Sequence, residues 1–254
     1  MSRKLLAAFG ASCSAIAILI APTASAQDTA GGADFSYTFL EASFLHRMDG
    51  LDTQLIDGGL PSNVLAGDGN GFFLRGSVEV QEGVFVFAEY EREESDYDIS
   101  AAFGGETVSG DFDVRSQSAR FGLGYFWSAS NNTDVYFQGG LSVAEFKAGT
   151  GTVIGETSGT SIPIDFADES QSGVSGLAEI GLRTRFSDAI EFDAAVNYQG
   201  ARKLELADAD SLKLSGEIGA RAAVRFLATD AFSIGAEFQK GTSDRLLVSV
   251  RARF

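Results

Sequence analysis

Arginine and carboxylate side chains recur two residues apart within otherwise apolar stretches of this 254-residue chain. Arg183 and Arg185 come just before the polar segment 187–189, and Glu191 and Asp193 come just after it. Residues two apart lie on the same face of a β-strand, and a tight turn between two such strands brings their charged faces together. The chemistry that this spacing predicts is ion pairing between guanidinium and carboxylate groups, with short charge-assisted hydrogen bonds.

Other tight turns in the sequence extend this ion-pair network. The same geometry predicts contacts of Arg75 with Glu89, Arg183 with Asp193, Arg185 with Glu191, and Arg221 with Glu237. Arg120 lies seven residues from the short-turn end of its own strand and should reach Glu89 from the other neighbouring strand. Glu179 shares the polar face of Arg183 and Arg185 and completes the predicted network. Because an unpaired charge in a narrow interior costs several kcal/mol, on the order of 3–5, we expect these side chains to be paired.

The single histidine, His46, offers a second kind of chemistry, since Asp49 and Asp52 follow it closely. A histidine beside acidic side chains can serve as a base that activates a nucleophile, so a hydrolytic site centred on His46 is one hypothesis. No second catalytic motif accompanies it in the sequence. We therefore predict that the protein is not an enzyme.

Acidic side chains also gather in two segments expected to form loops. They are Asp49, Asp52, Asp57, Asp68, Glu93, Glu94, Asp96, Asp98, Asp111 and Asp113. Carboxylate oxygens are the ligands that Ca²⁺ and Mg²⁺ prefer, which makes divalent cations candidate partners. The alternative is a solvated, self-repelling acidic surface, and no tightly bound cofactor is expected.

The elements that must position these residues are β-strands. Apolar and polar residues alternate with a period of two over 35–46, 71–81, 83–93, 114–127, 133–147, 172–186, 189–201, 211–227, 231–240 and 244–254. Each segment is close to or longer than the ~10 residues of a tilted membrane strand, and short connections alternate with longer ones. The pattern predicts an all-β, transmembrane, antiparallel up-and-down β-barrel of ten strands, or of eight if the first strand or the last hairpin is misassigned. The segments 97–103 and 107–114 also alternate weakly, which predicts a hairpin that continues beyond the membrane.

Both ends of the chain agree with this prediction. Residues 246, 248, 250, 252 and 254 are all apolar, whereas 249, 251 and 253 are Ser, Arg and Arg, so one face of the last strand suits hydrocarbon. The first 26 residues have a basic start, an apolar run and an Ala-Ser-Ala site, which is typical of a secretory signal peptide. Cys13, the one cysteine, lies inside it. Residues 27–254 would then form one barrel domain without disulfides.

The charge of the chain restricts its partners. The sequence has 19 basic and 35 acidic residues, and removal of Arg3 and Lys4 with the signal peptide leaves 17 − 35 = −18. Such a charge disfavours nucleic acid as a partner and suits cations or a solvated exterior.

Four segments of the sequence form a further pattern: the aromatic start with its glutamate at 37–41, the Asp-Gly-Asn-Gly-Phe segment at 68–72, the strand at 84–90, and the terminal Phe254. In these segments the chain resembles the small OmpA-like outer-membrane β-barrel proteins of Gram-negative bacteria. The resemblance implies residence in the cell outer membrane, contact with lipid and lipopolysaccharide, and recognition of Phe254 as an assembly signal by the barrel-assembly machinery. It implies no agreed activity, because members of this porin-like group are described as structural, adhesive or porin-like.

The predicted ion-pair network permits two interpretations. It could act as a gate in a polar conduit, or it could be a plug, since the interior of a small barrel can be filled by side chains. We favour the plug, and hence a structural or binding role exercised through acidic outer loops. The alternatives are a small porin that conducts through a narrow lumen, and a rim enzyme centred on His46.

Overall fold

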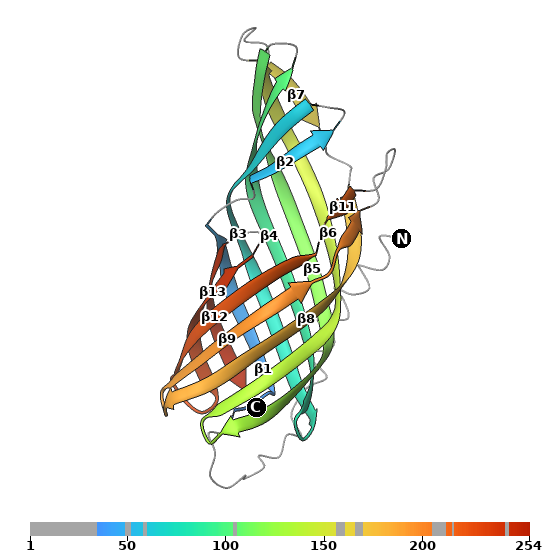
Figure 1. The fold of residues 1–254 in the computed structure, drawn as a ribbon. Coiled ribbons are helices and arrows are strands. Elements are labelled where there is room, and N and C mark those ends of the chain that lie inside the picture. Colours follow the sequence, from blue (N-terminus) through green and yellow to red (C-terminus); the bar gives the residue numbers. More distant parts are fainter. Residues whose placement is uncertain are drawn as a thin grey trace.

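The chain forms a closed, ten-stranded antiparallel β-barrel in the computed structural model (Figure 1). The structure describes residues 35–48, 52–57, 60–103, 106–155, 161–165, 170–204, 212–214, 216–241 and 244–254. The wall consists of β1 (Phe39–Arg47), β3 (Leu60–Gln81), β4 (Val84–Phe103), β5 (Glu106–Ser130), β6 (Thr133–Gly155), β8 (Ser170–Ser187), β9 (Ile190–Gln199), β12 (Glu217–Leu227), β13 (Phe232–Lys240) and β14 (Arg245–Arg253).

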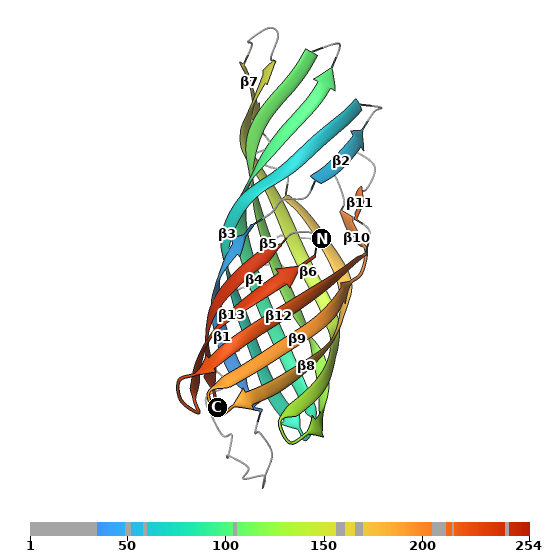
Figure 2. The ribbon, with the colours of Figure 1, turned by 60° about the vertical axis from the view of Figure 1, so that its left-hand side comes forward.

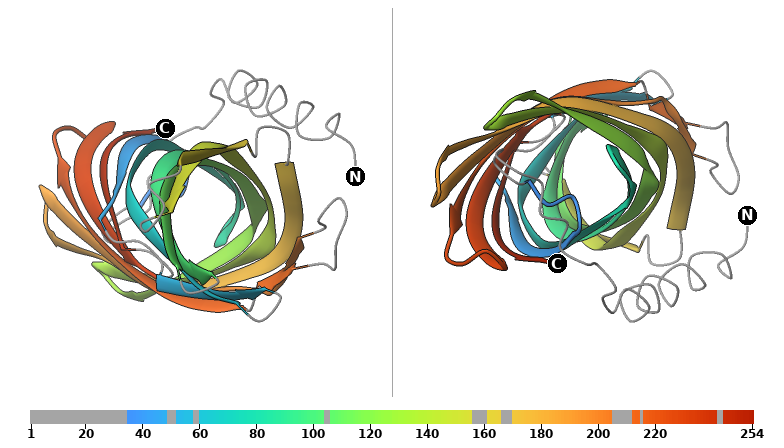
Figure 3. Two further views of the ribbon diagram at one scale, coloured as in Figure 1. Left: turned by 90° about the horizontal axis from the view of Figure 1, so that it is seen from above. Right: turned by 90° about the horizontal axis from the view of Figure 1, so that it is seen from below.

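The barrel closes because β1 pairs with both β3 and β14, so the first and last strands share one ladder. Figure 3 shows the resulting ring from both ends. The all-β fold class and the count of ten strands are thereby confirmed. No helix in the described residues is long and apolar enough to cross a membrane.

Alternation along each strand separates an outward apolar face from an inward polar face. In β14, Val248 is 53% exposed, whereas the adjacent Ser249 is 5% exposed and points into the lumen. The outward apolar band gives way to polar side chains at His46, Asn70 and Arg92. Within the apolar band, the outward face of the wall is therefore apolar, and charged side chains lie in the lumen.

The two ends of the barrel differ in length. At one end, here called the short-turn end, strands are joined by tight turns such as 81–84 and 130–133. At the other, the long-strand end, β3 to β6 continue far beyond the rest of the wall (Figure 2). β2 (Asp52–Asp57) pairs with β3 and β7 (Ser161–Asp165) pairs with β6, so they flank this extension.

The predicted hairpin over 97–103 and 107–114 is confirmed, because β4 and β5 stay paired up to Phe103 and Glu106. The long connections expected at 47–70, 94–113 and 148–171 are thus largely strand rather than loop. Each of these strands continues past the apolar band because its backbone stays paired with an equally long neighbour. The alternation of apolar and polar residues in the sequence does not reveal this continuation.

The predicted strand 211–227 is wrong in its first part. β12 begins at Glu217, opposite Gln199, where its partner β9 ends. Residues 212–214 form β11 (Leu212–Leu214), which pairs with β10 (Arg202–Leu204) in a separate two-stranded sheet. Lys213, which the alternation places in the lumen, therefore does not belong to a strand of the barrel wall.

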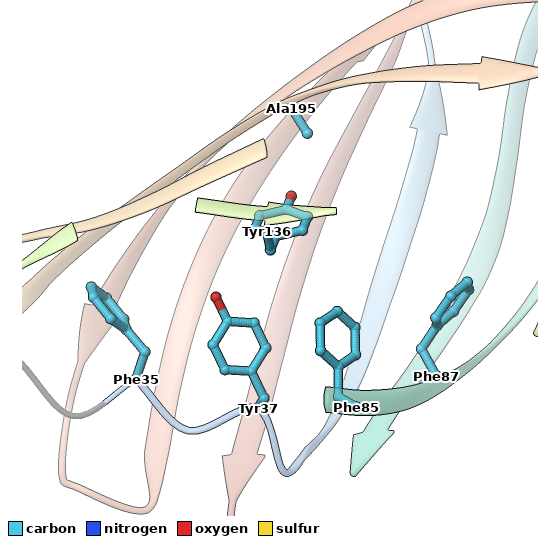
Figure 4. Packing of buried hydrophobic residues seen from close by; sticks show 6 residues of the cluster. All are labelled: Phe35, Tyr37, Phe85, Phe87, Tyr136 and Ala195. Atoms are coloured by element: carbon cyan, nitrogen blue, oxygen red, sulfur yellow. The ribbon is translucent and has the colours of Figure 1, made fainter. Parts of the chain in front are cut away.

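The first strand is also shorter than predicted, because β1 begins at Phe39 and not at residue 35. Residues 35–38, here called the entry segment, have no strand structure and run into the lumen at the short-turn end. Phe35 and Tyr37 are buried there against Phe85 (Figure 4). The remaining cluster members are Phe87, Tyr136 and Ala195.

Glycines on the wall leave the space that two of these rings need. A Cβ on Gly124 would overlap the ring of Phe85, and a Cβ on Gly181 would overlap the ring of Tyr136. The aromatic side chains thus lie flat over glycines of the neighbouring strands, a packing that compensates for the missing side chains.

We expect Gly124→Val to lower the free energy of unfolding by about 1–3 kcal/mol, since overpacking forces neighbours to shift. Urea titration of the refolded protein in detergent measures this change. Gly176→Val is the matched control, because a Cβ there meets no atom within 4 Å. Equal stability of the two variants would contradict this packing.

Candidate functional site: a buried ion-pair network in the lumen

Arg221, on β12, lies at the centre of the lumen network. Its guanidinium is 3.0 Å from Glu179, 3.0 Å from Asp193 and 3.3 Å from Glu237. It also donates a 2.6 Å hydrogen bond to the hydroxyl of Tyr136. One buried cation thereby joins carboxylates from β8, β9 and β13, which is a geometry suited to holding strands together.

Arg75, on β3, forms the second centre. Its Nε donates a 2.8 Å hydrogen bond to Glu89, and its Nη1 lies 3.3 Å from Glu237. The backbone register opposes Arg75 to Glu89 and Glu89 to Arg120, as the hairpin geometry predicts. Arg120 is more exposed and contacts Glu89 at 3.5 Å.

The β8–β9 hairpin has the register expected from sequence, with Arg183 opposite Asp193 and Arg185 opposite Glu191. The ion pair itself is diagonal, because Arg183 makes two hydrogen bonds to Glu191, of 2.8 and 3.1 Å. Arg185 lies 5.3 Å from the ring centre of Phe35 in a cation–π contact. Backbone register thus fixes which residues share a face, but not which neighbour a long guanidinium selects.

The register around the β12–β13 turn differs from the expected one by two residues. Arg221 is opposite Gln239, and Glu237 is opposite Ala223. The turn is wider than a tight two-residue turn, since the amides of residues 228 and 229 both bond to the carbonyl of Phe232. The predicted contact of Arg221 with Glu237 nevertheless exists, because the long side chain spans the offset.

A third group of charges lies nearer the short-turn end. Glu41 accepts a 2.8 Å hydrogen bond from Arg251 and lies 3.4 Å from Arg225. Arg225 is only 1% exposed and also approaches Glu191 and Glu237, at 3.7 and 3.6 Å. Carboxylates and guanidinium groups therefore alternate across the lumen with almost no exposed surface.

The sequence analysis did not predict the part of this network that lies nearest the long-strand end. Arg47 pairs with Glu93 at 2.5 Å, and Arg245 pairs with Glu91 at 2.9 Å. Glu93 is fully buried, so its assignment to an acidic outer loop is wrong. Its place could have been read from the alternation with Glu89 and Glu91, which continues for one more step on the same face of β4.

Below the ion pairs, at the short-turn end, an aromatic floor covers the lumen. It comprises Phe35, Tyr37, Phe85, Phe87, Phe126 and Tyr136. The rings of Tyr37 and Phe126 stack at 3.8 Å with an interplanar angle of 9°. Arg183 donates a 3.0 Å hydrogen bond to the carbonyl of Ser36, which fastens the entry segment to the network. Phe126 thus faces the lumen, whereas the adjacent Trp127 is exposed.

Above the ion pairs, toward the long-strand end, the lumen keeps a recess of about 130 Å³. Its polar lining includes the carboxamides of Gln138, Asn197, Gln199 and Gln239 together with Arg120. Gln199 donates to the hydroxyls of Ser142 and Ser175 at 3.2 and 3.3 Å. The buried ion pairs and the aromatic floor lie beneath the recess.

His46 lies on the outward side of β1, and its Nδ1 is 3.0 Å from Oδ1 of Asn70. Asp49 lies outside the described residues, and Asp52 belongs to β2. The hydrogen-bond partner that the structure gives His46 is therefore an amide and not a carboxylate. The described residues contain no group of three or more His, Cys, Asp or Glu side chains that could hold a metal ion.

The acidic residues of the β4–β5 hairpin have separate environments. Hydrogen bonds from Arg92 and Arg115 to Glu94 lower the pKa of this carboxyl group. Asp96 is directly opposite Asp113, and their shared hydrogen bond raises the pKa of Asp113. Two like charges cannot both ionise freely at such a short separation.

This acidic pair predicts a pH dependence of the outer hairpin. A group whose pKa is raised in the folded state stabilises the fold below its unfolded pKa, and this contribution is lost as the pH rises through the folded pKa. We expect amide-exchange protection around Asp96 and Asp113, corrected for the intrinsic rate, to fall between pH 4 and pH 7.5. The fall should be smaller in Asp113→Asn, whereas an equal fall in both proteins would contradict this coupling. The contribution of Glu94 to stability changes with pH in the opposite direction, because its pKa is lowered. Since Glu94 is present in both proteins, the comparison between them removes this contribution.

Phe254 ends the chain beside the entry segment, with its side chain 56% exposed on the outward face. Its amide donates a 3.2 Å hydrogen bond to the carbonyl of Thr38. The terminal residue thus helps to close the seam between the first and last strands. Recognition of Phe254 during assembly stays a prediction.

Comparison with known proteins identifies the group to which this barrel belongs. A family model described as "Outer membrane protein beta-barrel domain" matches residues 11–226. The chain belongs to this family. The protein is thus an outer-membrane β-barrel, with its apolar band in lipid and lipopolysaccharide, and its short turns are of the kind that face the periplasm.

Several solved structures are similar in fold at low sequence identity. The translocator domain of the autotransporter NalP from Neisseria meningitidis is 13% identical, with 99% of this chain and 98% of that chain covered and a TM-score of 0.43. OprG from Pseudomonas aeruginosa is 12% identical, with 86% and 96% covered and a TM-score of 0.41. The outer membrane protease OmpT from Escherichia coli is 9% identical, with 86% and 95% covered and a TM-score of 0.49. The comparison with curated proteins finds no significant match.

Proposed function

We propose that this outer-membrane barrel is closed to solutes and acts as a structural or binding element at the cell surface. The observation that carries the proposal is the buried ion-pair network, in which Glu41, Glu191 and Arg225 are each at most 2% exposed. A conducting lumen would need a continuous path of water along its polar side chains. Here the polar side chains contact one another instead, and the aromatic floor lies beneath them.

The binding role in this proposal belongs to the extension at the long-strand end. β3 to β6, with β2 and β7 at the flanks, present a sheet beyond the apolar band. Aspartates lie opposite one another on its outward side, at Asp96 with Asp113 and Asp98 with Asp111. A sheet with open flanking strands can pair with an extended segment of a partner, and its acidic residues would favour a basic one.

A small porin is the second candidate, favoured by the polar recess of about 130 Å³. A liposome-swelling assay separates the two functions. Liposomes that contain the refolded protein should swell in small sugars or amino acids no faster than protein-free liposomes. Swelling that depends on solute size would reject the closed barrel and support the porin.

The hypothesis of a rim enzyme has its own test. If His46 activates a nucleophile, His46→Ala should abolish any hydrolysis of peptide or ester substrates that the wild-type protein shows. We expect the wild-type protein to hydrolyse none of these above background. Hydrolysis that is lost in His46→Ala would establish the enzyme.

A further inference from the structure

A small cavity lies between the aromatic floor and the ion pairs, with a volume of about 40 Å³. Its lining combines rings of the aromatic floor, such as Tyr37 and Phe85, with Ser77 of β3 and with charged side chains of the network. One water molecule occupies roughly 30 Å³ in the liquid. The cavity is therefore large enough to hold a water molecule or a monoatomic ion.

Two hydroxyl groups at this cavity have no hydrogen-bond partner among the described residues. They belong to Tyr37, in the entry segment, and Ser77, on β3, and each of these residues is 4% exposed. In Figure 4 the Tyr37 hydroxyl points towards the side on which Tyr136 lies. A buried hydroxyl without a partner is costly, so both groups indicate a ligand in the cavity that can hydrogen-bond to them.

The charges that line the cavity select the sign of that ligand. Guanidinium groups come from Arg75, Arg183, Arg221 and Arg251, whereas the carboxylates in the lining are those of Glu89 and Asp193. Carboxylates such as Glu179 and Glu191 pair with these arginines but are not part of the lining. The charged groups that face the cavity are therefore mainly guanidinium donors, which suits a ligand that accepts hydrogen bonds and carries negative charge.

We propose that this cavity binds one small monovalent anion of the halide class. Tyr37 and Ser77 donate hydrogen bonds to it, and the surrounding guanidinium groups supply the charge. Because Tyr37 lies in the entry segment and Ser77 in the wall, the anion joins the two. Its binding stabilises the position of the entry segment and of the aromatic floor.

Bromide provides a direct probe, because its anomalous scattering locates it in crystals of the full-length mature protein. Wild-type crystals grown in sodium bromide should show an anomalous peak within hydrogen-bond distance of both hydroxyls. The peak should disappear in the Tyr37→Phe/Ser77→Ala double variant and persist in Ser43→Ala. Ser43 is the matched control, since its hydroxyl is also buried and without a partner but does not line the cavity.

Urea unfolding supplies a measurement that does not require crystals. The unfolding midpoint of the wild-type protein and of Ser43→Ala should rise with chloride concentration at constant ionic strength, and then saturate, as binding linkage requires. The double variant should lose this saturable rise. Water alone in the cavity, with no bromide peak, or the same chloride dependence in all three proteins, would overturn the proposal.

Discussion

Arg221→Met is expected to lower the free energy of unfolding by about 3–5 kcal/mol, the range observed when one partner of a buried ion pair is removed. The cause is the set of carboxylates that Arg221 neutralises: Glu179, Asp193 and Glu237 lie within 3.0 to 3.3 Å of it. Methionine fills a similar volume but leaves these charges without their shared counter-ion. Urea unfolding in detergent micelles, followed by tryptophan fluorescence or heat-modifiable mobility, measures the loss.

Lys240→Met is the matched control for Arg221→Met. Lys240 also pairs with an acid, Asp244, at 3.1 Å, but its side chain is 70% exposed. Exposed ion pairs contribute only about 0–1 kcal/mol. Similar losses in the two variants would show that the lumen network is solvated and does not fill the barrel.

Tyr37→Ala has the second-largest expected effect, a loss of about 3–5 kcal/mol, as for other buried aromatic residues truncated to alanine. The ring of Tyr37 stacks on Phe126 at 3.8 Å and on Phe85 at 5.1 Å, so its removal opens the aromatic floor at its centre. Arg183 also loses the ring that it faces at 5.3 Å. The measurement is again the midpoint of urea unfolding.

Tyr37→Phe separates the ring from its hydroxyl. Because the hydroxyl has no partner among the described residues, this variant should retain most of the stability in a buffer without halide. A loss as large as that of Tyr37→Ala would mean that the hydroxyl, and not the stacked ring, stabilises the floor.

The barrel could be predicted from sequence because a strand that crosses a membrane obeys a strict two-residue period. Alternation in β14 assigns Val248 to lipid and Arg251 to the lumen, and the structure agrees. The two-residue period no longer predicts a strand of the wall where the chain has left the barrel and neither face has to be buried. Lys213 continues the alternation of β12, yet it lies beyond the point where the wall has a partner strand.

The ion pairs were predictable as a set of residues but less so as individual contacts. Backbone register assigns Arg183 and Asp193 to the same side, whereas the choice of Glu191 by Arg183 depends on how the guanidinium bends within a crowded lumen. The aromatic floor was harder to predict from the sequence, because the residues around Tyr37 alternate as those of a strand do. The floor also depends on the space that Gly124 and Gly181, which are distant in sequence, leave for the rings of Phe85 and Tyr136.

Planar-bilayer conductance of the refolded mature protein tests the central claim, a lumen closed by its own side chains, most directly. The wild-type protein should give no reproducible channels, whereas Arg221→Ala, which removes the central cation of the network, should open intermittently. The variant shows that the protein inserts in a form able to conduct once the network is broken. Steady channels of uniform conductance in the wild-type protein would contradict the closed barrel and establish a porin.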